Sequence, residues 1–215
     1  AAGSGTRLGY KTPKAFVPLK GKPVVWYSLR TFHDVTSVRD VVLVVPAGME
    51  TTARQLVTKS RFGKIKHVIP GGAERKDSVI NGLSALKGST RPVLIHDAAR
   101  PLADKALIGR VVEALGNNPV VIPVVPVSDT VKHVDSRTNI VKKTLERESL
   151  RAVQTPQGFR PEVITYLIRR IRIADKAYDE AMLLERKYPV AVVDGDPRNF
   201  KITVPADLAL AGYLL

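Results

Sequence analysis

The sequence predicts an α/β fold with a mostly parallel sheet that is covered by helices on both faces. Short, wholly apolar runs, typical of strands buried on both faces, alternate with stretches whose apolar residues recur at helical spacing. Such alternation of strand and helix is typical of parallel sheets. The 215 residues, 44% hydrophobic and 25% charged, suffice to bury one sizeable core, and this composition excludes a mainly disordered chain.

Four apolar runs are expected to form strands of this sheet. They are residues 41–45, 92–95, 120–127 and 190–193. Apolar residues at helical spacing predict helices over residues 24–32, 51–57, 77–86, 106–115 and 163–171. A last helix is expected from Pro205 onward, because proline is tolerated in a first helical turn and Asp207 is favourable there. Since the sequence shows no repeat, linker or composition shift, we expect residues 1–215 to form one domain.

Residues 128–150 interrupt the alternation. Two β-like stretches, 130–134 and 140–145, flank the turn-forming residues 135–139, and this pattern predicts a β-hairpin inserted into the domain. Two arrangements are open for the hairpin. It lies flat on its own sheet, or it protrudes as an arm and pairs with another subunit.

The net charge of +14 indicates an anionic partner. A nucleic-acid-binding module would concentrate its cations in a tail or on one helix, often among exposed aromatic residues. Here the cations are spread along the whole chain and aromatic residues make up only 6% of it. We therefore expect no nucleic-acid partner, and attribute the charge to phosphate binding and to a basic surface.

The remaining composition excludes several other classes. No apolar run approaches the ~20 residues that cross a bilayer, and no secretory leader is visible, so we expect a cytoplasmic protein without a membrane partner. The absence of cysteine excludes disulfides, thiolate nucleophiles and iron–sulfur clusters. The four histidines show no metal-binding spacing, so transition-metal catalysis is not expected.

The glycine-rich run Gly3-Ser4-Gly5-Thr6-Arg7, followed by Pro13-Lys14, predicts a phosphate-binding loop. Glycines let backbone N–H groups approach phosphate oxygens, while arginine and lysine neutralise developing charge. Leu8 stands where a dinucleotide-binding loop needs glycine, and Gly21-Lys22 lacks the Ser or Thr of a Walker A loop. Because such a loop normally follows a strand, we expect a leading strand ahead of Ala1.

Further polar loops follow the predicted strands. After the turn Gly71-Gly72, the backbone of Gly72 and Ala73 and the Ser78 hydroxyl can read a base edge, although an ordinary loop with a capped helix is the favoured explanation of this segment taken alone. Asp97 and Arg100 follow the strand at 92–95, where ligands bind in open α/β sheets.

Three more features belong to these loops. His96 is expected to orient its loop by hydrogen bonding, and Thr155 sits at another strand end. Lys201 lies between the strand at 190–193 and a further expected strand at 202–204, where its ammonium can face phosphate. Asp194 and Asp196 are expected to form a turn rather than to bind magnesium.

Together these segments resemble the 2-C-methyl-D-erythritol 4-phosphate cytidylyltransferase family, in order and over essentially the whole chain. The matching segments are AAGSGTRLG with Pro13-Lys14, GGAERKDSV at 71–79, HDAARP at 96–101, Asp129-Thr130 with Lys132, QTPQGF at 154–159, and Phe200-Lys201-Ile202-Thr203 with Asp207-Leu208. The resemblance implies a Rossmann-like nucleotidyltransferase fold and a homodimer with swapped β-arms. It also implies CTP as substrate and a divalent cation such as Mg²⁺, held by the CTP phosphates with Asp97 as the candidate protein ligand.

The resemblance also implies roles for individual residues. The catalytic cations are Arg7, Lys14, Arg147 on the arm, and Lys201. The CTP-binding set is Ala1, Ala2, Gly3, Gly5, Gly72, Ala73 and Ser78. The set for the polyol phosphate is Asp97, Arg100, Thr130 and Thr155. One departure stands at Tyr178-Asp179-Glu180, where the family's pattern begins with threonine.

Two alternatives remain beside this interpretation. A ribitol 5-phosphate cytidylyltransferase would share the fold and the nucleotide, although Ala98-Ala99 favours methylerythritol phosphate. A non-catalytic basic module that binds nucleotides or RNA would keep the charge, but it would not need Arg7, Lys14 and Lys201 together.

Overall fold

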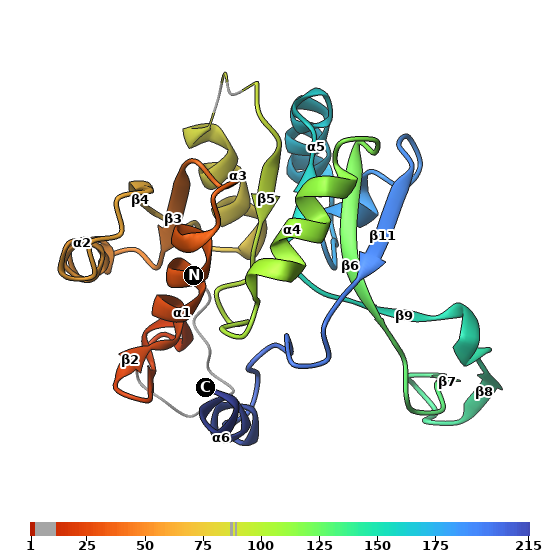
Figure 1. Cartoon of the computed structure of the whole chain (residues 1–215). Helices are drawn as coiled ribbons and strands as arrows, with labels where there is room; N and C mark the ends of the chain where they lie inside the picture. Colours follow the sequence, from red (N-terminus) through yellow and green to blue (C-terminus); the bar gives the residue numbers. More distant parts are fainter. Residues whose placement is uncertain (3–11, 87, 89) are drawn as a thin grey trace.

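The computed structural model describes residues 1–2, 12–86, 88 and 90–215, and strands and helices alternate along it as predicted (Figure 1). The helices are α1 Val24–Asp34, α2 Glu50–Lys59, α3 Arg75–Ala85, α4 Lys105–Ala114, α5 Pro161–Ile173 and α6 Pro205–Leu214, with the 3₁₀ turns η2 Lys14–Phe16, η3 Arg147–Ser149 and η4 Ala181–Leu183. The strands are β1 Pro18–Leu19, β2 Lys22–Pro23, β3 Val41–Val45, β4 Ile65–Pro70, β5 Val93–Ile95, β6 Val120–Pro126, β7 Lys132–Val134, β8 Val141–Thr144, β9 Arg151–Val153, β10 Gln157–Phe159 and β11 Val190–Asp194.

The main sheet has five strands in the order β11-β6-β10-β5, with β9 also paired to β6. β11 is parallel to β6. β5 and β6 run in the same direction, because β10 lies antiparallel between them. β3 and β4 form a separate parallel pair. The predicted α/β class is confirmed, with β9 and β10 as antiparallel members of the sheet.

Helices cover both faces of the main sheet, and the side chains of β6 show why. Val120, Ile122 and Val124 pack into one core with α5 and α3. Val121, pointing the other way, packs against α4. A strand whose alternate side chains both enter cores must be apolar throughout, and each buried valine contributes about 1.5–3 kcal/mol relative to an exposed one.

The ends of the helices follow local sequence signals. Asp104 caps α4, since its carboxylate accepts a hydrogen bond from the Leu107 N–H at 2.7 Å. Pro205 opens α6, and Asp207 accepts two backbone N–H bonds from the residues just before that helix. The predicted C-terminal helix is thus confirmed, and it buries its own Ala211 against Leu19 and Val24. No helix within the described ranges combines the length and apolar composition of a membrane span.

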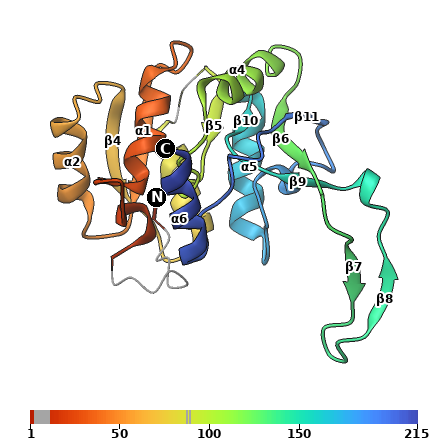
Figure 2. The same cartoon turned by 60° about the horizontal axis from the view of Figure 1, so that its bottom comes forward.

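The predicted hairpin at 128–150 contains β7 and β8, which pair with each other antiparallel and with no other strand of the described chain. Both strands are exposed along their length. Asp135 holds the turn by accepting the N–H of Arg137 at 2.9 Å, and Asn139 adopts a left-handed conformation with φ 56°. Figure 2 shows this hairpin extending away from the sheets of its own chain, and its pairing with another subunit stays a prediction.

Two expectations about strands need correction, and the structure adds strands that were not expected. Residues 202–204 form no strand, because Val204 is already the residue that precedes α6 and Ile202 is buried below it. β11 is an edge strand and is not buried on both faces, since Val192 is 60% exposed. The short or polar strands β4 and β10 were not predicted, because their sequences lack a long apolar run, whereas β9 is the strand expected ahead of Thr155.

Candidate active site

The loop after β5 meets the segment between β9 and β10. Gln157 of β10 is paired with Ile95, the last residue of β5. This register brings Thr155 beside the loop, and its hydroxyl oxygen accepts the Asp97 N–H at 3.0 Å. Asn199, in the loop after β11, is the third member of this group. Its side-chain amide donates to the Thr155 carbonyl at 2.9 Å. Three segments far apart in sequence therefore share one site.

His96 links this group as a half-buried, neutral imidazole. Its Nε2 lies 3.3 Å from the Arg100 carbonyl, which can only accept, and its Nδ1 lies 3.1 Å from the Thr155 hydroxyl. These partners assign the proton to Nε2 and make Nδ1 the acceptor. Burial lowers the pKa of His96 to about 4, with Asp97 opposing and Arg100 reinforcing the shift. The orienting role expected for His96 agrees with these contacts.

Acid should destabilise the protein through His96. A pKa lowered in the folded state means that the unfolded chain binds more protons between pH 6.5 and about 4. The free energy of unfolding should therefore fall as pH drops through this window, by up to about 3 kcal/mol from His96 alone. Urea unfolding of wild type and His96→Gln at several pH values measures the difference. Equal pH slopes for the two proteins would contradict this assignment.

Asp97 lies between two cations of the site. The Lys201 ammonium donates to its Oδ2 at 2.7 Å, and Arg75 Nη2 lies 3.7 Å from its Oδ1. Burial opposes ionisation of Asp97, but these two cations outweigh burial and hold the pKa of Asp97 well below its usual range. The site therefore holds a carboxylate between two cations at any ordinary pH.

Two further predicted cations border this group. Lys14 donates from Nζ to the Ile202 carbonyl at 2.7 Å, and the Ile202 N–H bonds to the Ala99 carbonyl in the Asp97 loop. Arg100 donates to the Asn199 carbonyl at 2.7 Å and to the Val153 carbonyl at 3.3 Å. Lys14 therefore reaches the site from the other end of the sequence, whereas Arg100 in this structure joins loops.

The glycine turn after β4 contains residues that are expected to contact the nucleotide. Ser78 accepts the Gly72 N–H at 3.2 Å and donates to the Glu74 carbonyl at the start of α3. A Cβ built on Gly71 would lie 2.4 Å from the Cβ of Ala2, so the first residues of the chain lie against this turn. Ala73 is exposed beside it. Ala1 also lies nearby, packed against the core of β3 and β4.

Gly72→Ala should disturb this turn. The added methyl would lie 2.1 Å from the Asp77 Cβ, a backbone-proximal atom that cannot move away without shifting the start of α3. We expect the KM for the nucleotide to rise about tenfold, since backbone groups here are expected to contact it. Steady-state kinetics test this, with Gly63→Ala as the matched control because nothing lies within 4 Å of that position. Unchanged nucleotide KM in folded Gly72→Ala would contradict the prediction.

The structure does not bring the arm residues to this site. Arg147 donates to the Ser128 carbonyl at 2.9 Å within the arm, and Thr130 is exposed at the arm's base. The arm extends away from the strand ends in both views (Figures 1 and 2). The predicted residues Gly3, Gly5 and Arg7 lie outside the described residues.

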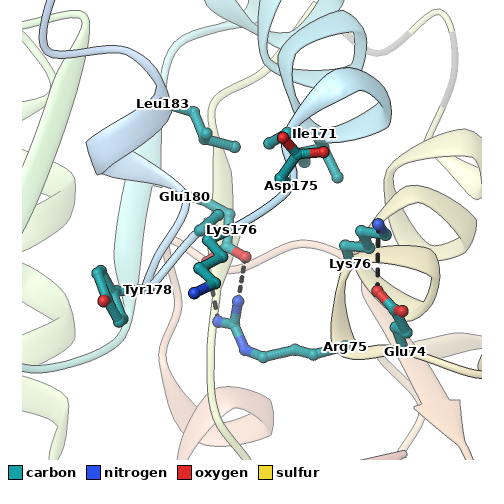
Figure 3. A pocket seen from close by; sticks show the side chains of 11 residues that line it. Glu74, Arg75, Lys76, Ile171, Asp175, Lys176, Tyr178, Glu180 and Leu183 are labelled. Atoms are coloured by element: carbon teal, nitrogen blue, oxygen red, sulfur yellow. Dashed lines mark hydrogen bonds and ion pairs between the residues drawn. The ribbon is translucent and has the colours of Figure 1, made fainter. Parts of the chain in front are cut away.

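Sequence reasoning missed Arg75 and its partner. Arg75, the first residue of α3, donates through both Nη atoms to the Glu180 carboxylate, with the Nη2–Oε2 distance 2.9 Å. Figure 3 shows this pair at one side of a cavity of about 250 Å³ between α3, the end of α5 and the 174–183 segment. Two features of the sequence could have pointed to this pair. They are the charged run after the glycine turn and Asp179-Glu180, to which no role was assigned.

The described residues do not fit a protein-held metal site. No group of three or more histidine, cysteine, aspartate or glutamate side chains lies together among them. Asp97, the candidate ligand, already faces Lys201 and Arg75, and a metal ion there would have to displace a bonded cation.

A glycine turn and several cations around one carboxylate, at the strand ends of an α/β sheet, are typical of a nucleotide-dependent transferase that handles phosphate. The chain matches the family model described as IspD: 2-C-methyl-D-erythritol 4-phosphate cytidylyltransferase over residues 1–215. The chain therefore belongs to the IspD family.

Individual relatives agree with this assignment. The cytidylyltransferase of that name from Nocardia farcinica is 46% identical over 218 residues, covering 100% of this chain and 91% of the relative. The one from Corynebacterium efficiens is 42% identical and covers 98% and 89%. The solved 4-diphosphocytidyl-2C-methyl-D-erythritol synthase from Anaerococcus prevotii superposes with a TM-score of 0.86 at 30% identity, over 100% of this chain and 94% of that one.

Proposed function

We infer that this protein transfers CMP from CTP to 2-C-methyl-D-erythritol 4-phosphate, giving CDP-methylerythritol and pyrophosphate in non-mevalonate isoprenoid precursor biosynthesis. Its family membership over residues 1–215 supports the activity. The observation that carries the chemistry is the convergence of Lys14, Lys201 and Arg75 around the Asp97 loop. These cations suit a reaction in which two phosphate compounds meet.

The reaction needs no side-chain base. An oxygen of the acceptor phosphate, already ionised near neutral pH, attacks the α-phosphorus of CTP in line, and the bond to the pyrophosphate oxygen breaks. Negative charge spreads over the phosphorus oxygens during this step. Catalysis then depends on positioning and on fixed cations, for which we propose Arg7, Lys14, Arg147 and Lys201.

We propose that CTP lies along the glycine turn. The proposed contacts come from the first residues and from the start of α3: Ala1, Ala2, Gly3, Gly5, Gly72, Ala73 and Ser78. The exposure of Gly72 and Ala73 supports the proposal, because the backbone of a glycine turn lets a ligand approach closely.

We propose that the acceptor binds at Asp97, Arg100 and Thr155, with Thr130 and Arg147 contributed by the arm of a second copy in a homodimer. The exposed arm supports a swapped arrangement, since its apolar Ile140 and Val141 are 65% and 52% exposed in a single chain. Both substrates are soluble metabolites, which supports a cytoplasmic location.

Magnesium is proposed to enter with the CTP phosphates and not through a site built from protein ligands. Mg²⁺ commonly keeps several waters and binds substrate phosphates with few protein ligands. Asp97, already paired with Lys201, suits the acceptor hydroxyls better than a metal ion.

Pyrophosphate release tests this function directly. We expect release with CTP and methylerythritol phosphate, loss of release in excess EDTA, and much slower release with ribitol 5-phosphate. Faster release with ribitol 5-phosphate would favour the other cytidylyltransferase. Absence of release with any polyol phosphate would contradict the enzyme assignment.

A further inference from the structure

Arg75 lies between two carboxylates that belong to different parts of the fold. Both its Nη atoms bond to Glu180, and Nη2 also lies 3.7 Å from Asp97 Oδ1 (Figure 3 shows the Glu180 side). The Glu180 side chain is only 4% exposed, whereas that of Arg75 is 43% exposed. Glu180 is thus the buried anchor, and the guanidinium is the part that reaches the site.

The anchor is itself held by the main sheet. Gln157 of β10, fully buried, donates from Nε2 to Asp179 Oδ2 at 3.0 Å and accepts the Ala181 N–H at 3.3 Å. Asp179 Oδ1 accepts the Met182 N–H at 2.8 Å. The segment that departs from the family pattern therefore fixes Glu180 against β10, while Tyr178 stays 86% exposed.

Arg75 lies between the segment proposed to bind CTP and the segment proposed to bind the acceptor. Its backbone opens α3, directly after the turn that contains Gly72 and Ala73. Its side chain ends beside Asp97, whose other oxygen is bonded to Lys201. Without Arg75 the Asp97 carboxylate would keep its bond to Lys201 and lose the cation that attracts Oδ1, so its orientation would be set less firmly.

We infer that Arg75, anchored by Glu180, is a positioning residue that fixes the orientation of the Asp97 carboxylate for the acceptor. The inference rests on the proposed function and deepens it. Since Asp97 is expected to contact the acceptor, loss of Arg75 should affect acceptor use much more than CTP binding. A misplaced contact of this kind costs about tenfold or more in kcat/KM.

The test removes both partners together. Loss of Arg75 alone would leave the Glu180 carboxylate buried without its cation, which is strongly destabilising, whereas replacing both members of a pair by neutral groups is often tolerated. Arg75→Met with Glu180→Gln is therefore the main variant. Lys76→Met is the matched control, because Lys76 is the next residue of α3 and pairs only with exposed Glu74 at 3.1 Å among the described residues.

Wild type, measured first, must release pyrophosphate; its failure would count against the proposed function and not against this inference. In the double variant we expect kcat/KM for methylerythritol phosphate to fall about tenfold or more, with KM for CTP within about twofold of wild type. Lys76→Met should match wild type, and Arg75→Lys, which keeps the positive charge, should recover part of the loss.

Two results would overturn the inference. One is wild-type kinetics in a double variant whose melting temperature is unchanged. The other is an equal loss for both substrates, which a merely structural pair would give. If the double variant does not fold, Glu180→Gln alone decides the question, because it preserves shape and removes only the charged anchor. Wild-type acceptor kinetics in folded Glu180→Gln would reject the role.

Discussion

Lys14→Ala is expected to lower kcat by about 10²-fold or more while leaving the fold nearly intact. The ammonium of Lys14 is proposed to stabilise charge that develops on the phosphorus oxygens only as the transition state forms. Its loss should therefore lower kcat and kcat/KM together and change KM little. In the folded protein Lys14 donates to the Ile202 carbonyl at 2.7 Å, and such a bond contributes about 1 kcal/mol to stability.

Lys64→Ala is the matched control for this measurement. Lys64 also donates from Nζ to a backbone carbonyl, that of Val35 at 2.6 Å, but it lies before β4 and away from the Asp97 loop. Both variants lose an equivalent hydrogen bond, so their melting temperatures should fall alike and only Lys14→Ala should lose turnover. Near wild-type turnover in Lys14→Ala would reject its catalytic role.

The fold could be predicted where local chemistry determines the structure. β6 was predicted because its side chains enter cores on both faces and must all be apolar. The N-terminal signal of α6 was equally local, since Pro205 and Asp207 act within one helical turn. β10 was not predictable in this way, because the buried polar side chain of Gln157 has its hydrogen-bond partners in Asp179 and Ala181, more than twenty positions away.

The candidate site also combines residues that the local sequence predicts with contacts that only the fold creates. Asp97 and Thr155 were predicted individually from their places after strands, and the structure joins them through the register between β10 and β5. The pairing of Lys201 with Asp97 and of Arg75 with Glu180 spans more than a hundred positions in each case. No spacing rule in a single sequence connects such residues, because their contact depends on how the loops pack.

Arg147→Ala should abolish most activity, yet mixing it with Lys14→Ala should restore part of it. If the arm acts across a dimer, each site combines Lys14 of one copy with Arg147 of the other. A heterodimer of the two variants then holds one intact site and one site that lacks both residues. Random mixing should give about a quarter of wild-type activity, since half of the dimers are heterodimers.

The single-chain geometry is the reason to expect this result. Arg147 bonds within the arm to the Ser128 carbonyl and Glu148, and the arm points away from the Asp97 loop of its own chain. Differently tagged subunits allow heterodimers to be purified before assay. Mixing Lys14→Ala with the double variant Lys14→Ala, Arg147→Ala leaves no intact site and should restore nothing. Inactive heterodimers of the two single variants would assign Arg147 to its own chain's site or to none, because a cation that works in trans must complement.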